Sequence, residues 1–120
     1  MQRRMTFEEF QYLMMIGGDQ SILDATFYAM DALNGKWKLK ILFLLYTGQT
    51  IRFNEIKRAL KGITSRQLIS DLRSLEEASF IDKEKSPENR EVKIYVLTDK
   101  GRDLLYLFYD FMNWGYAYQH

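Results

Sequence analysis

The sequence predicts a mainly α-helical fold with a small β-hairpin, and two observations carry this prediction. Two segments of helical character, about 55–60 and 65–78, meet across the turn Lys61-Gly62-Ile63-Thr64, which is the spacing of a helix-turn-helix. After Ala78 the period changes, because the segments 80–85 and 91–97 alternate and contain β-branched residues. A helix-turn-helix followed by a two-stranded hairpin is a winged helix.

Three helices are expected before the helix-turn-helix. Thr6 and Glu9 form a capping box that opens the first helix, and Gly17-Gly18 ends it. Ser21 opens a second helix, which ends at Asn34-Gly35. The third helix, 37–46, has a strongly apolar centre at 41–45 and is expected to be buried on most sides.

The next elements follow from their start signals. The segment 51–53 is expected to be a short strand, and Asn54 is expected to cap the helix that follows. Thr64 and Gln67 form a second capping box, at the start of helix 65–78. The buried face of that helix is predicted from one run of apolar residues: Leu68, Ile69, Leu72 and Leu75.

The C-terminal part is predicted as a hairpin and one long helix. Residues 86–90 form the hairpin tip, and Thr98 caps a last helix that runs to about Trp114. We expect three segments in the chain: an N-terminal dimerisation or packing helix in 1–20, a winged helix-turn-helix core in 21–98, and an aromatic dimerisation helix in 99–120.

Composition excludes several classes of protein. The chain of 120 residues is 47% hydrophobic and 28% charged, so it can bury a core. It has no segment of about 18 apolar residues that could span a membrane, and no secretory signal. We therefore expect no membrane partner and a cytoplasmic protein.

Catalytic and metal chemistry find no support in the sequence. Cysteine is absent, which excludes disulfides, thiolate metal sites and thiol redox sensing. The single histidine is the last residue, His120, and no phosphate-cradling glycine loop is present. We expect no enzyme activity, no cofactor and no metal.

Charge is distributed unevenly along the chain. Residues 36–73 hold nine basic and two acidic residues, for a net charge of +7, whereas 1–35 and 74–120 each carry −3. A basic middle between acidic flanks indicates a positive surface with an anionic partner. The alternative is an ordinary solvated lysine-rich face.

The predicted recognition helix has a polar face rich in hydrogen-bond donors. Arginine matches guanine and glutamine matches adenine in the major groove of B-DNA, where a helix fits. We therefore expect base contacts from four side chains: Arg66, Gln67, Ser70 and Arg73. The alternative is a solvent-facing helix surface.

Other polar residues are expected to contact the DNA backbone. The free N–H groups of the first helical turn, together with Ser65, can bind a phosphate. Further phosphate contacts are expected from four basic residues: Lys36, Lys38, Arg52 and Lys57. The wing is expected to touch the backbone or minor groove through Asn89 and Arg90, backed by Lys85 and Lys93.

The terminal helices are expected to form a two-fold homodimer, since symmetric DNA readers are usually dimers. Large exposed apolar patches mark interfaces. The expected interface residues are Phe7, Phe10, Leu13, Tyr106, Tyr109, Phe111 and Trp114. One alternative is burial of these side chains within one chain, and another is an aromatic pocket at the dimer seam for an unidentified small-molecule effector.

A second class of function is a winged-helix module that docks on protein. The positive middle segment argues against it, because a protein-docking face is more often apolar or mixed in charge.

The residues also resemble a known family. Asp31-Ala-Leu-Asn-Gly-Lys-Trp37 resembles the "GGKW" signature of HxlR-type helix-turn-helix regulators, which are MarR-like winged-helix proteins. The resemblance extends over about 24–115, through Arg52-Phe53-Asn-Glu-Ile56, Leu60-Lys-Gly-Ile-Thr64 and Tyr95-x-Leu97-Thr98-x-Lys100-Gly101. It implies a bacterial-type, homodimeric, DNA-binding transcription regulator. Family members often carry a Cys-Pro pair where this chain has Ser21 to Thr26, so the thiol sensing of some members is not expected here.

Overall fold

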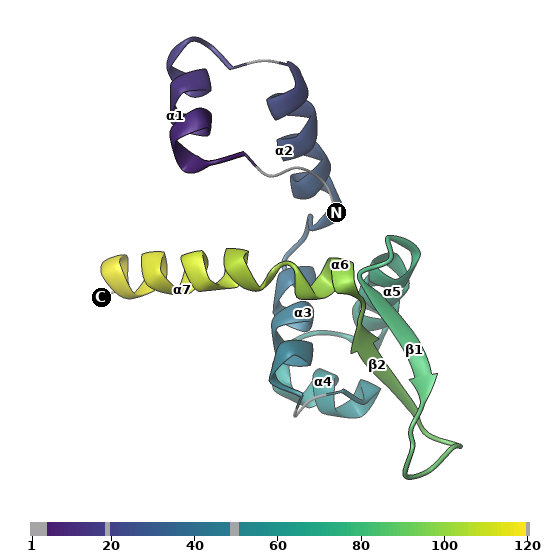
Figure 1. The fold of residues 1–120 in the computed structure, drawn as a ribbon. Helices are drawn as coiled ribbons and strands as arrows, with labels where there is room; N and C mark the ends of the chain where they lie inside the picture. Colours follow the sequence, from purple (N-terminus) through teal and green to yellow (C-terminus); the bar gives the residue numbers. More distant parts are fainter. Residues whose placement is uncertain (1–4, 19, 49–50, 120) are drawn as a thin grey trace. The chain divides into compact units, whose positions relative to one another are not determined.

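The computed structural model describes residues 5–18, 20–48 and 51–119. The chain divides into two compact units, Met1–Asn34 and Gly35–His120, drawn in Figure 1. This division falls inside the segment 21–98 that the sequence analysis assigned to a single core. The roles expected for the three segments stay predictions.

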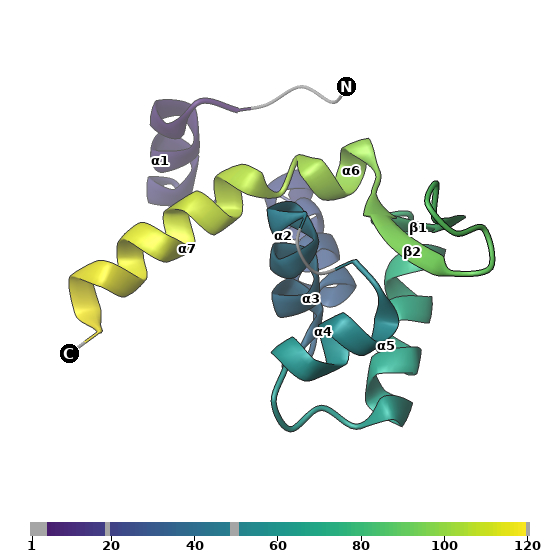
Figure 2. The ribbon, with the colours of Figure 1, turned by 90° about the horizontal axis from the view of Figure 1, so that it is seen from below.

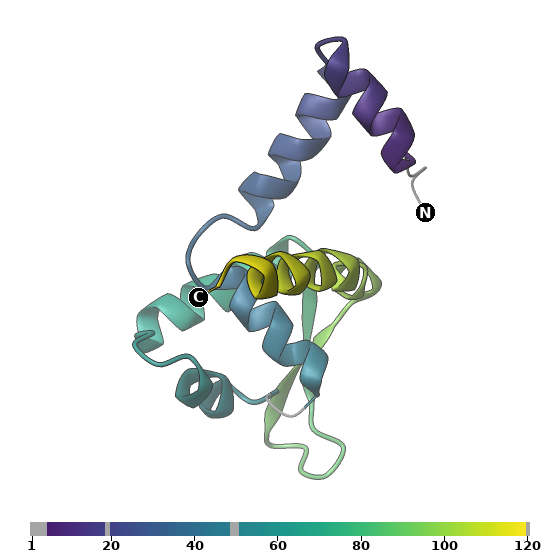
Figure 3. The same ribbon diagram turned by 90° about the vertical axis from the view of Figure 1, so that its left-hand side faces the viewer.

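The N-terminal unit consists of helices α1 (Phe7–Met15) and α2 (Gln20–Ala32). The capping box is present: Oγ1 of Thr6 accepts a hydrogen bond from the Glu9 N–H at 3.1 Å, and the Glu9 carboxylate accepts one from the Thr6 N–H at 3.3 Å. Gly17 and Gly18 both have positive φ, which ends α1 as predicted (Figure 3). Neither helix contains a buried residue.

The second unit holds α3 (Lys38–Thr47), α4 (Phe53–Ala59) and α5 (Ser65–Glu77), with the antiparallel hairpin of β1 (Ile81–Lys85) and β2 (Lys93–Leu97) beside them. Figures 1 and 2 show this winged helix-turn-helix arrangement, which the sequence predicted. The apolar side chains that form its core are Ile41, Leu42, Leu45, Ile56, Leu60, Ile63, Leu68, Leu72, Leu75, Phe80, Ile81, Ile94, Tyr95 and Phe108.

Helix α3 is less buried than predicted. Ile41, Leu42 and Leu45 are buried, but Phe43 is 51% exposed and Leu44 is half-buried. Phe43 faces α7, where its ring contacts the Phe108 ring edge-to-face at 5.5 Å.

Two predictions between α3 and α4 were wrong. Residues 51–53 do not form a strand, although the Ile51 carbonyl accepts one hydrogen bond from the Tyr95 N–H at 2.9 Å. Asn54 is not the cap of α4, because the helix begins one residue earlier, at Phe53. The Glu55 carboxylate instead accepts hydrogen bonds from the N–H groups of Arg52 and Ile51, and so satisfies the start of the helix from within.

The last helix is broken into α6 (Asp99–Arg102) and α7 (Leu105–Tyr118), where one helix was predicted. Thr98 does cap α6, because its Oγ1 accepts from the Gly101 N–H at 3.2 Å. The Tyr46 hydroxyl donates to the carbonyl oxygens of Gly101 and Arg102, and the Gly101 carbonyl also accepts from the Leu104 N–H. These contacts occupy acceptors that a continuous helix would use, and α7 extends away from α3 (Figure 1).

Among the described residues, no helix is both long enough and apolar enough to cross a membrane.

Candidate nucleic-acid interface

Helix α5 is held in the domain by one face and starts at a defined position. Gly62 in the preceding turn has a φ of +94°, which an L side chain rarely adopts. Thr64 caps the helix, because its Oγ1 accepts from the Gln67 N–H at 3.0 Å. Leu68, Leu72 and Leu75 are buried, so the opposite face of α5 points outward.

The outward face carries three of the four predicted base-contacting side chains with no partner among the described residues. Arg66, Ser70 and Arg73 are exposed. Neither arginine forms an ion pair with any residue in the described part of the chain. The guanidinium groups are therefore available to an outside acceptor.

Gln67 is exposed but engaged. Its side-chain amide donates to Oδ1 of Asp71 at 3.0 Å, rather than reaching back to Thr64 as the capping-box prediction required. Asp71 is only 8% exposed. A buried carboxylate needs a donor, and Gln67, one turn earlier on the helix, supplies it.

Ile69 was predicted to be buried and is not. It is 47% exposed, because the helical face formed by Leu68, Leu72 and Leu75 leaves it at the margin. It lies three residues after Arg66 and four before Arg73, so the three side chains are neighbours on the helix surface. The spacing of apolar residues alone could not distinguish a position at the margin of the buried helix face from a buried position.

Most of the basic residues expected to contact the DNA backbone lie on the second unit's surface. Lys36 is exposed, with Nζ 4.7 Å from the centroid of the Trp37 ring, over which Lys40 also lies at 5.2 Å. Lys38 and Lys57 are half-buried, and Ser65 is exposed at the start of α5. The exposure of these side chains does not test the predicted phosphate contacts, which stay predictions.

A polar hollow of about 480 Å³ lies between the start of α4 and strand β2. Three cationic residues line it, Arg52, Arg58 and Lys93, together with Glu55. The hydrogen bond from the Arg52 N–H is the main cause that holds the pKa of the Glu55 carboxyl below its usual value. Glu55 is thus a structural cap that stays ionised among the cations.

The register of the hairpin separates its charges. Lys85 pairs with Lys93 and Lys83 pairs with Tyr95, so three lysines share one face, while Asp82 and Glu84 point to the other. The Lys83–Tyr95 face is turned toward α5, since both residues line a hollow there with Ile69 and Arg73. Among these lysines the sequence analysis placed Lys85 and Lys93 in the wing contact and missed Lys83, although the alternation in 81–85 was visible.

Hydrogen bonds within the hairpin tip hold its conformation. Oδ1 of Asn89 accepts from the Glu91 N–H at 3.1 Å, and the Asn89 carbonyl accepts from the Val92 N–H at 3.0 Å. Ser86 is buried, and its Oγ accepts from the Glu88 N–H. Arg90 is exposed. Asn89 thus shapes the turn, whereas Arg90 and Lys85 are the predicted wing residues that project.

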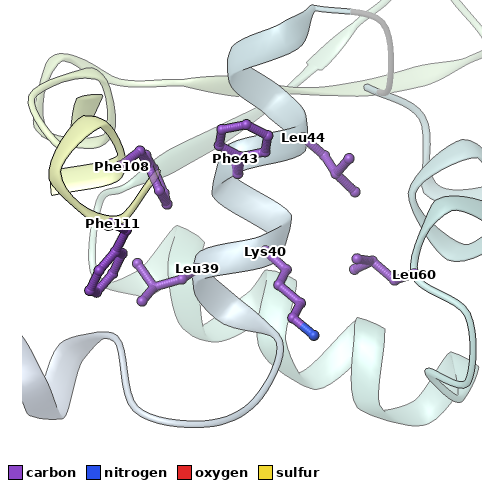
Figure 4. A pocket seen from close by; sticks show the side chains of 7 residues that line it. All are labelled: Leu39, Lys40, Phe43, Leu44, Leu60, Phe108 and Phe111. Carbon is purple, nitrogen blue, oxygen red and sulfur yellow. The ribbon is translucent and has the colours of Figure 1, made fainter. Parts of the chain in front are cut away.

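An apolar groove of about 370 Å³ lies beside α3 (Figure 4). Phe43 and Leu39 of α3, Leu60 at the end of α4, and Phe108 and Phe111 of α7 line it. Beyond the groove, α7 exposes the predicted interface residues Tyr106, Tyr109, Phe111 and Trp114. On α1, Phe7 and Phe10 are exposed and Leu13 is half-buried.

A capped helix with a cationic outer face, set after a glycine turn and beside a lysine-faced hairpin, defines a winged helix-turn-helix protein of the DNA-binding class. The family model described as HxlR-like helix-turn-helix matches residues 32–120. The chain belongs to this family of MarR-like transcriptional regulators, as the sequence resemblance predicted.

Curated relatives carry the same description. An HTH-type transcriptional regulator of Halalkalibacterium halodurans is 35% identical over 105 residues, which cover 87% of this chain and 93% of the relative. Another HTH-type transcriptional regulator, from Methanothermobacter thermautotrophicus, is 36% identical over 101 residues, which cover 84% of this chain and 76% of the relative.

Solved structures share the fold. A MarR-family transcriptional regulator from Enterococcus faecalis V583 has a TM-score of 0.69 at 31% identity and covers 85% of this chain and 90% of its own. The redox regulator HypR in its oxidized form has a TM-score of 0.70 at 30% identity and covers 80% and 98%, respectively. This chain has no cysteine, so a thiol switch does not carry over from redox-sensing relatives.

Proposed function

We propose that this regulator binds duplex DNA sequence-specifically, with α5 in the major groove. One observation carries the proposal: the apolar face of α5 is locked into the core, and Arg66, Ser70 and Arg73 project from the opposite face. A helix fixed in this way presents its first turns to base edges, where arginine matches guanine. Gln67 contributes mainly by holding Asp71, with its remaining amide groups at the edge of the site.

The hairpin would contact the backbone or minor groove. Lys85 and Lys93 stand directly opposite each other, and like charges in this position destabilise a hairpin. A phosphate group between them would remove the repulsion. Arg90, at the tip, would extend the contact, and Arg52 and Lys57 would add backbone contacts from α4. Lys36, Lys38 and Ser65 would complete the set.

DNA selection tests this proposal. The full-length protein is used to select duplexes from a random library, and affinity for the selected and random duplexes is measured at two salt concentrations. We expect enrichment of a two-fold symmetric site, and affinity for random duplex that falls steeply with salt. Weak binding to random DNA that does not change with salt, with no enriched site, would instead favour a protein-docking module.

We further propose that the protein acts as a homodimer through α1 and α7. Neither α1 nor α2 contains a buried residue, and every aromatic side chain of α7 except Phe108 is exposed. This amount of apolar surface indicates an interface. Sedimentation of the Tyr109→Asp, Trp114→Asp double variant should give a monomer, whereas Asp110→Asn, on the same helix, should stay dimeric. A double variant that sediments like the wild type would rule out α7.

The apolar groove beside α3 supports a second proposal, that DNA binding responds to an apolar small-molecule effector. Its lining of three phenylalanines suits an aromatic ligand. A screen of aromatic compounds should find one that raises the melting temperature and changes DNA affinity. If Phe43→Ala does not abolish that response, the ligand binds elsewhere.

These roles are those of a cytoplasmic, nucleoid-associated regulator rather than an enzyme. A fluorescent fusion should follow the nucleoid, and the Arg66→Ala, Arg73→Ala double variant should spread through the cytoplasm.

A further inference from the structure

Ile69 is the one apolar side chain that interrupts the cationic outer face of α5. It is 47% exposed, and it lies between Arg66 and Arg73 on the helix surface. A side chain at this position points into the same groove as the two arginines when α5 binds DNA as proposed. Its position beside the two arginines, and not its exposure alone, therefore places Ile69 where it can contact the DNA.

Ile69 also forms one wall of a hollow of about 150 Å³ between α5 and the hairpin. The apolar part of this lining comes from Ile69, Leu72, Phe53 and Tyr95. The charged part comes from Arg73, Lys83 and Glu76, with the two cations outnumbering the one acid. Such a hollow suits a small apolar group attached to a polyanion.

The edges of the bases in the major groove offer one such group. Guanine, cytosine and adenine present donors and acceptors there, and thymine presents a carbonyl and a 5-methyl group. Isoleucine cannot donate or accept a hydrogen bond, so a guanine, cytosine or adenine edge against it would lose hydration without compensation. A thymine methyl group against Ile69 would bury apolar surface on both partners.

We infer that Ile69 is a specificity-determining residue that selects thymine through its 5-methyl group, beside the bases that Arg66 and Arg73 read. The inference rests on the proposed DNA binding by α5. It predicts a thymine in each half-site, adjacent to a guanine.

The test uses DNA selected by the full-length protein and changes one methyl group at a time. Each thymine of the selected site is replaced in turn by deoxyuridine, which lacks only the 5-methyl group. At one position per half-site, the replacement should weaken wild-type binding about fourfold, the value of one buried methylene-sized group. Replacement of thymines outside the half-sites should have no effect.

Variants then assign the methyl contact to Ile69. Ile69→Ala should bind the thymine site about as weakly as the wild type binds the deoxyuridine site, and should no longer distinguish the two. Ile69→Val should show an intermediate difference. Melting temperatures of both variants should stay close to that of the wild type, because the side chain is half exposed.

The outcomes separate the two hypotheses. Failure to enrich any DNA sequence would overturn the proposed function and this inference with it. A selected site with no thymine in the half-site, or one at which deoxyuridine never weakens wild-type binding, would overturn the inference and leave DNA binding in place. Equal sensitivity of the wild type and Ile69→Ala to deoxyuridine would also overturn it, since another residue would then read the methyl group. If Ile69→Ala does not fold, the comparison of the wild type with Ile69→Val assigns the methyl contact, and equal sensitivity of these two proteins to deoxyuridine would overturn the inference.

Discussion

The side-chain amide of Gln67 donates a 3.0 Å hydrogen bond to Oδ1 of Asp71, one helical turn further along α5. Asp71 is 8% exposed, so the bond stabilises a carboxylate that has little access to water. One N–H of a residue with the correct chemistry to read adenine is thereby used within the helix that carries it.

Gln67→Ala should therefore lower the free energy of unfolding by about 1 kcal/mol, because it leaves the Asp71 carboxylate without its donor. Ser70→Ala, on the exposed face of the same helix, should change it by less than about 0.5 kcal/mol. Urea denaturation of both variants measures the difference. Equal stability of the two, with a large loss of DNA affinity only for Gln67→Ala, would restore Gln67 to a purely recognising role.

Arg66→Ala and Arg73→Ala should each weaken binding to the selected DNA site by about 1–3 kcal/mol, because each removes a bidentate base contact. Fluorescence anisotropy with labelled duplex measures the affinity. Arg102→Ala is the matched control, since Arg102 pairs with Asp99 at 2.6 Å on α6. If both α5 variants keep wild-type affinity and an intact fold, α5 is not the recognition helix.

Lys36→Ala should reduce the slope of log affinity against log salt concentration by about one, because one phosphate contact is lost. Lys40→Ala serves as the control. Its ammonium group also lies over the Trp37 ring, but it is not among the predicted phosphate contacts. An unchanged slope for Lys36→Ala would remove Lys36 from the backbone contacts.

Two glycine-to-alanine changes should have opposite effects on stability. A Cβ at Gly101 would lie 2.3 Å from the Phe80 carbonyl oxygen, so Gly101→Ala should lower the free energy of unfolding by about 1–3 kcal/mol. A Cβ at Gly115 would meet nothing within 4 Å, and Gly115→Ala should stabilise α7 by about 0.5–1 kcal/mol. Thermal unfolding compares them. A neutral Gly101→Ala would mean that α6 can move away from Phe80.

Glu55→Gln should destabilise the domain at neutral pH and have little effect in acid. The pKa of Glu55 is lowered in the folded chain, chiefly by the Arg52 N–H. Its ionised form therefore stabilises the fold above the unfolded pKa of about 4.3, and this stabilisation is lost as the pH falls through the lower folded value. The free energies of unfolding of the two proteins should converge as the pH falls below the folded pKa of Glu55. A stability difference that does not change with pH would mean that charge plays no part in the cap.

The sequence predicted those parts of the fold that depend on local signals. Capping residues Thr6, Thr64 and Thr98, and the turn at Gly62, act on their immediate neighbours, and the structure has each of them. The alternation that predicted the hairpin is equally local. The helix-turn-helix and its wing were predictable for this reason.

Two errors were local, since Glu55 rather than Asn54 satisfies the start of α4 and Gln67 bonds Asp71 rather than Thr64. The other errors arose where a residue distant in the sequence decides the outcome. The break between α6 and α7 depends on the hydroxyl of Tyr46, 55 residues before Gly101 in the chain. The exposure of Ile69 depends on where the hairpin meets α5. The spacing of apolar residues within the helix carries no information about that contact. The candidate site shares this limit: the cationic face was predictable from the sequence, but the lysine face of the hairpin needed the strand register.

The break after α6 also has a geometric consequence. Helix α7 is anchored near its start by Phe108, whose ring contacts Phe43 and Tyr46. Measured from its first residue, Leu105, its 14 residues form a lever arm of about 20 Å. A rotation of about 10° at Asp103–Leu104 would move its free end by about 4 Å, close to the rise of one base pair. If two such arms join the halves of a dimer, the angle at this joint sets how many base pairs separate the half-sites of the operator.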